Sequence, residues 1–103
     1  MTALTSKTID LVNHLFPAES QTVQQLLETE CGQNLPLLKN GTPESLERIR
    51  FAALKVSKGN ADKLLDAISP AKHDWRDLLM WADFGNDLKR HEKWAEEILN
   101  GKS

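Results

Sequence analysis

The segment from Thr42 to Gly59 constrains the fold of this chain more than any other, because its ends and its interior all specify one long helix. Thr42 supplies a capping hydroxyl, Pro43 takes the first helical position, and Gly59 ends the helix. The apolar side chains between them cover more than half of the helical circumference. We therefore expect this helix to lie at the centre of an all-α protein, with neighbours on two sides.

Five further helices are predicted from similar start and stop signals. Their expected ranges are about 6–16, 19–31, 61–69, 74–84 and 86–99, and Pro70 is expected to end the fourth helix of the chain. Short connections favour helices packed as antiparallel neighbours. We predict one domain over residues 1–103, arranged as a bundle or as a short armadillo-like array, with frayed ends at 1–5 and 100–103.

The composition argues against several kinds of partner. The net charge is −2, with 13 Lys and Arg residues interspersed among 15 Asp and Glu residues, so no strong positive field is expected for nucleic acid or for a membrane surface. Helices three and four imitate a helix-turn-helix, but Asp62 and Asp66 would face the phosphates. The N-terminus lacks a secretory pattern and Cys31 is the only cysteine, which together predict a cytoplasmic location.

Arg50 breaks the apolar pattern of the central helix. It lies about 40° from Leu46 on the helical wheel, within the apolar arc. A buried guanidinium needs a carboxylate or several carbonyl oxygens. We predict a buried ion pair that ties this helix to the fifth, formed by Arg50 with Asp74 or Asp77, with Asp83 as a further candidate partner. An anion-binding site at Arg50, or extension of its side chain to solvent, remains an alternative.

The sequence Asp74-Trp75-Arg76-Asp77 opens the fifth helix, and Trp81 and Phe84 follow it. Trp81 lies away from the inward line of this helix, so we expect its indole near the surface. Tryptophan and arginine are enriched at the centres of protein interfaces. We therefore predict an interaction surface, to which the loop at 33–41 also contributes; packing of these aromatic residues in the core is the alternative. The predicted surface consists of Trp75, Arg76, Trp81 and Phe84.

Residues 28–94 also resemble a family of small bacterial all-helical proteins with no established activity. The pieces that carry the resemblance are Glu30-Cys31-Gly32, Asn34-Leu35-Pro36, the run from Glu47 to Lys55, and the run from Asp74 to Leu79 continuing to Phe84-Gly85. The resemblance covers about two-thirds of the chain. It implies a helical, armadillo-like fold and no catalytic residue. Trp81 stands where the family usually has a small residue.

Residues suited to catalysis or metal binding do not form a recognisable pattern. His14, His73 and His91 lie on separate elements, and Cys31 sits at the C-terminal end of a helix, where the helix dipole raises a thiol pKa. We expect no metal, no cofactor and no enzyme activity. The preferred hypothesis is a protein–protein interaction module with an unknown protein partner or a second copy of itself. The alternative is an anion- or small-ligand-binding protein, or an enzyme, with a pocket around Arg50 between helices three and five.

Overall fold

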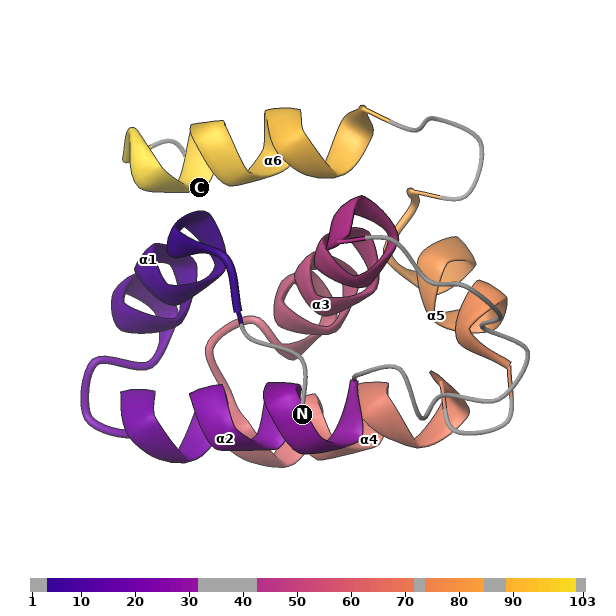
Figure 1. Ribbon diagram of the computed structural model, residues 1–103, viewed down its shortest axis with the longest axis horizontal. Coiled ribbons are helices and arrows are strands. Elements are labelled where there is room, and N and C mark those ends of the chain that lie inside the picture. Colours follow the sequence, from indigo (N-terminus) through magenta and orange to yellow (C-terminus); the bar gives the residue numbers. More distant parts are fainter. Residues whose placement is uncertain (1–3, 32–42, 72–73, 85–88, 102–103) are drawn as a thin grey trace.

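The computed structural model of this chain describes residues 4–31, 43–71, 74–84 and 89–101. This part of the chain contains six helices and no strand, which confirms the predicted all-α class (Figure 1). The helices are α1 (Ser6–Leu15), α2 (Ser20–Glu30), α3 (Pro43–Ser57), α4 (Ala61–Ala71), α5 (Trp75–Trp81) and α6 (Arg90–Leu99). The loop at 33–41, which was predicted to contribute to the interaction surface, lies outside the described residues. Most of the predicted frayed ends lie outside them too.

Helix α3 is the centre of the molecule, as its wide apolar arc predicts. It contacts α1, α4, α5 and α6, while α2 packs against α1. In Figure 1, α6 lies across α1 and α3, and α4 lies on the opposite side of α3. The helices therefore form a compact bundle around α3, which positions the ends of α3, α4 and α5 close together.

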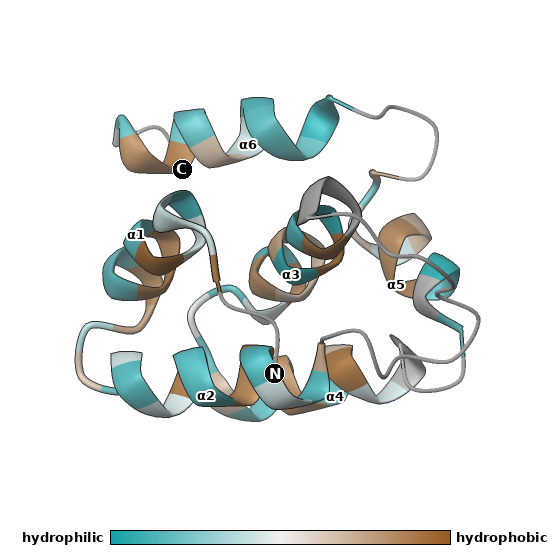
Figure 2. Cartoon of the chain, viewed as in Figure 1, coloured by the Kyte–Doolittle hydropathy of each residue, from teal (hydrophilic) through white to brown (hydrophobic). Residues whose placement is uncertain are grey.

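The core is built around α3, which contributes more fully buried side chains than any other described helix. Figure 2 shows the apolar segments of the helices turned toward the interior, with hydrophilic segments outside. Burial of this apolar surface is the main stabilising contribution, because each buried aliphatic or aromatic side chain is worth about 1.5–3 kcal/mol. The apolar side chains that α3 buries are Leu46, Ile49, Phe51, Ala52, Ala53 and Leu54.

The start of α1 is tied to α3 by a capping residue. The Oγ1 of Thr5 accepts the backbone N–H of Thr8 at 3.2 Å, which caps α1. The same hydroxyl donates to Oε1 of Glu47 at 2.7 Å, and Glu47 belongs to α3. One threonine therefore both begins a helix and fixes its position against the central one.

Two predicted helix ends are wrong. Helix α4 passes Pro70 and ends at Ala71, because a proline in the last turn removes only one backbone hydrogen bond. Helix α5 ends at Trp81, earlier than the predicted end near Gly85. Its terminus is a Schellman motif with Asp83 in the left-handed region (φ 66°): Asp83 N donates to Met80 O at 3.1 Å, and Phe84 N donates to Leu79 O at 2.9 Å. The predicted start of the sixth helix at 86 is also wrong, because α6 begins at Arg90 with Lys89 in the N-cap position.

Candidate functional site

Arg50 is buried, as predicted, with only 2% of its surface exposed. Its Nε–H donates to the main-chain carbonyl oxygen of Cys31 at 3.0 Å, at the C-terminal end of α2. The last carbonyl oxygens of a helix accept no hydrogen bond from N–H groups of the same helix, and they carry partial negative charge. They are therefore suitable partners for a buried cation. Burial lowers the pKa of the Arg50 guanidinium, with the charges of Cys31 and Glu28 acting in the opposite direction.

The predicted ion pair between Arg50 and Asp74 or Asp77 is not formed. Asp74 caps α5 by accepting the backbone N–H of Arg76 at 3.0 Å, and its two carboxylate oxygens also accept from Nε and Nη2 of Arg76, at 2.9 and 2.8 Å. These hydrogen bonds from Arg76 hold the pKa of Asp74 below its ordinary value. Asp77 is exposed. The carboxylates at the start of α5 therefore face solvent and Arg76, while Arg50 is directed toward the end of α2.

Two cationic side chains of α3 hold the C-terminal end of α5. Lys55 Nζ donates to Ala82 O at 2.8 Å and lies 5.0 Å from the centre of the Phe84 ring. Arg48 Nη2 donates to Phe84 O at 2.5 Å. These carbonyls belong to the turn where the negative end of the helix dipole lies, so the cations are well placed electrostatically. The end of α5 is thus held against the central helix by two hydrogen bonds.

The predicted interaction surface is only partly exposed. Phe84 is fully buried, packed near His91 and Trp94 of α6, so its inclusion in the surface was wrong. The reason is its place directly after the left-handed Asp83, where the Schellman motif turns the chain back onto the core. The side chain of Arg76 is 65% exposed, and Trp81 is 55% exposed, as expected for an indole away from the inward line. The side chain of Trp75 lies outside the described residues.

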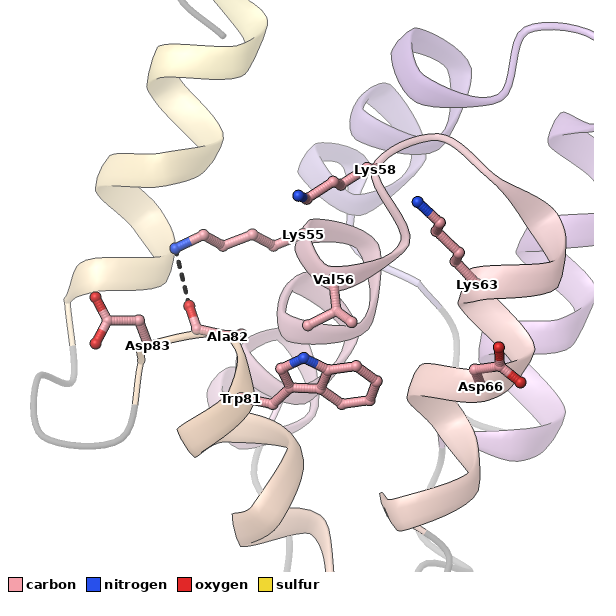
Figure 3. A pocket seen from close by; sticks show the side chains of 8 residues that line it. All are labelled: Lys55, Val56, Lys58, Lys63, Asp66, Trp81, Ala82 and Asp83. Atoms are coloured by element: carbon pink, nitrogen blue, oxygen red, sulfur yellow. Dashed lines mark hydrogen bonds between the residues drawn. The ribbon is translucent and has the colours of Figure 1, made fainter.

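Trp81 lines a pocket between the ends of three helices (Figure 3). The pocket has a volume of about 460 Å³, within the range of about 300–1,000 Å³ typical of binding clefts, and is open to solvent on one side. Its floor and rim come from the C-terminal end of α3, the N-terminal half of α4 and the C-terminal end of α5. The lining residues are Lys55, Val56, Lys58, Lys63, Asp66, Trp81, Ala82 and Asp83. Arg50 is not among them.

The charges of this pocket fall into two groups. Lys55 is bound to Ala82, and Asp83 is paired with Nη1 of Arg90 at 2.8 Å. Within the described chain, the side chains of Lys58, Lys63 and Asp66 form no ion pair and no hydrogen bond. Two lysines therefore face one aspartate, and the pocket carries local positive charge on a chain whose net charge is −2.

Backbone strain is concentrated at the same place. In the described ranges, the residues other than glycine with positive φ are Lys58 (51°) and Asp83 (66°), and both line the pocket. Such conformations carry a steric cost and are enriched at functional sites. Sequence reasoning missed Lys58 and Lys63, because a lysine near a helix end is also the ordinary choice for a solvated surface. These two lysines differ from ordinary surface lysines only because the ends of three helices come together beside them.

In the described residues, no three His, Cys, Asp or Glu side chains converge on a point that would hold a metal ion. The same part of the chain has no helix with the length and apolarity needed to cross a bilayer.

Comparisons of the chain with family models, with curated proteins and with solved structures found no match. The resemblance to small bacterial helical proteins therefore stays a prediction, and the residues of the structure alone support the functional proposal.

Proposed function

We propose that this protein is a non-enzymatic module that binds another protein through Trp81 and the pocket beside it. The observation that carries the proposal is the 55% exposure of a tryptophan on a helix end that α3 holds in place. An indole in water has a large apolar area to bury, and a rigid support lowers the entropy cost of binding. Tryptophan is also the residue most enriched among interface residues that dominate binding energy.

The neighbouring residue extends this surface. Met80 is 65% exposed and directly precedes Trp81 on α5. Methionine and tryptophan together adapt to the shape of an apolar partner side chain. The predicted Arg76 lies on the same helix and is exposed, but it is paired with Asp74 and does not line the pocket. A cytoplasmic location, expected from the sequence, is part of this proposal.

The alternative of an anion or ligand pocket around Arg50 has less support. Its Nε–H is directed to Cys31 at the end of α2, and the 460 Å³ pocket between α3, α4 and α5 is lined by other residues. Arg50 therefore serves to join α3 to α2, which is a structural role.

The proposed surface is tested by affinity capture from the native host with the wild type, Trp81→Ala and Leu99→Ala in parallel. Leu99 is a matched control, because it is an exposed apolar residue on α6, outside the proposed surface. We expect the wild type and Leu99→Ala to retain the same stoichiometric partner and Trp81→Ala to lose it. Recovery of the same proteins by all three variants, or of none, would show that the surface is wrongly placed. The mass of the purified complex separates a different partner from a homodimer.

A further inference from the structure

We propose that the pocket beside Trp81 receives an acidic segment of the partner protein, with one apolar side chain of that segment seated against the indole. This inference rests on the protein-binding function proposed above and adds the chemistry of the partner. It is argued from the charges that line the pocket, from the position of the indole, and from the exposed residue beside it.

The charge of the pocket selects an acidic occupant. Lys58 and Lys63 come from different helix ends, and Figure 3 shows both ammonium groups on the same side of the pocket. Asp66 follows Lys63 by three positions in α4 and forms no ion pair with it, so the two lysines outnumber the one aspartate among these pocket charges. A carboxylate placed between the lysines gains two favourable interactions, whereas a basic segment would meet like charges.

The indole selects the apolar part of the same occupant. In Figure 3, Trp81 lies across Val56 from the two lysines, so one pocket presents an apolar wall and a cationic wall. A segment that satisfies both must carry an apolar side chain with an acidic residue close to it in sequence. Lys55 also lines the pocket, and one of its three N–H donors is already used by Ala82 O.

The extent of the surface indicates a polypeptide instead of a small anion. Met80 is outside the pocket and directly precedes Trp81 in sequence, and it is 65% exposed. A small anion would contact the lysines and leave both Trp81 and Met80 in water. A segment of several residues covers the pocket and the methionine together, and so buries the whole apolar area.

The test is a selection of random peptides of about ten residues, displayed on phage, on the immobilised full chain. We expect enrichment of peptides that carry an aromatic or large aliphatic residue with acidic residues within a few positions. Synthetic peptides from the selection should bind the wild type more weakly as ionic strength rises. Trp81→Ala should abolish the preference for the apolar residue, and the double variant Lys58→Glu/Lys63→Glu should weaken binding by about tenfold or more.

The matched control is the double variant Lys89→Glu/Lys93→Glu, at the N-cap and in the first turn of α6, which changes the net charge by the same amount at two other exposed lysines. It should bind the selected peptides like the wild type. Thermal melting of each variant confirms that the fold is retained. The inference is overturned by enrichment of neutral or basic peptides, by no enrichment, or by an equal effect of the two double variants. It is also overturned if inorganic phosphate alone displaces the peptides, or if the wild-type chain forms a dimer that Trp81→Ala abolishes.

These results are separable from a failure of the proposed function. If affinity capture depends on Trp81 but not on Lys58 and Lys63, the module binds a protein through its indole and the acidic chemistry is wrong. If capture does not depend on Trp81, the surface itself is wrong and both proposals fall.

Discussion

The Nε–H of Arg50 donates to the main-chain carbonyl oxygen of Cys31 at 3.0 Å, so a buried cation of the central helix binds the C-cap residue of α2. Helix α2 otherwise packs mainly on α1. This hydrogen bond therefore connects it to the centre of the molecule. The bond also places a full positive charge at the negative end of the α2 dipole, which is a favourable arrangement inside a protein.

Replacement of Arg50 by alanine should lower the free energy of unfolding by about 3 kcal/mol, because it leaves a cavity and a buried carbonyl without its donor. Arg50→Lys should cost less, since it keeps the charge. Chemical denaturation followed by circular dichroism measures the change. Arg76→Ala is the matched control, because that arginine is exposed and its ion pair with Asp74 should contribute little to stability. Equal effects of the two alanine variants would contradict the structural role of Arg50.

Lys55→Met should lower the free energy of unfolding by about 1 kcal/mol. The substitution keeps an unbranched side chain that is one atom shorter, but it removes the hydrogen bond to Ala82 and the charge over the Phe84 ring. Lys63→Met is the comparison, because this lysine lines the same pocket without such contacts, and it should change stability by less than about 0.5 kcal/mol. Denaturant titrations of both variants provide the measurement. If Lys63→Met lowered the free energy of unfolding more than Lys55→Met, the role assigned to Lys55 in holding α5 would be wrong.

Gly59→Ala should destabilise the protein by about 1–2 kcal/mol for two reasons. Gly59 has φ of 77°, which an L residue adopts at a steric cost, and an added Cβ would lie 3.2 Å from the carbonyl oxygen of Leu15. Gly101 has a similar φ of 82°, but an added Cβ there meets nothing within 4 Å. Gly101→Ala should therefore cost less, which a comparison of melting temperatures shows. A Gly101→Ala cost as large as that of Gly59→Ala would mean that the contact with Leu15 is unimportant.

The carboxyl of Asp74 should titrate below its ordinary pKa of 3.8, because its ionised form accepts hydrogen bonds from Arg76. Since the folded pKa is lower than the unfolded one, the ionised carboxylate stabilises the fold above pH 3.8, and this contribution is lost as the pH falls through the folded pKa. In Arg76→Ala the pKa of Asp74 should rise toward its ordinary value. Carboxyl-detected NMR titration measures it, and Arg90→Ala should leave it unchanged. An Asp74 pKa unaffected by Arg76→Ala would disprove the assignment.

Some features of this protein follow from residues that are close in sequence. The predicted third helix, from Pro43 to about Lys58, matches α3, because capping, proline position and glycine termination act within a few residues. The burial of Arg50 and the exposure of Trp81 were also predicted, since helical periodicity alone decides which face each residue occupies.

Other features depend on how the helices pack. Arg50 binds a carbonyl 19 positions away, and no local pattern indicates which helix end will approach a buried cation. Phe84 follows Asp83, whose left-handed conformation turns the chain so that Phe84 is buried, and the helix pattern alone did not indicate this turn. The pocket at Trp81 likewise exists only where three helix ends meet.

Local sequence determined which segments are helical and which faces they bury, because those depend on short-range hydrogen bonds and periodicity. The tertiary structure decided which charged groups and helix ends meet, because that depends on the packing of the whole chain.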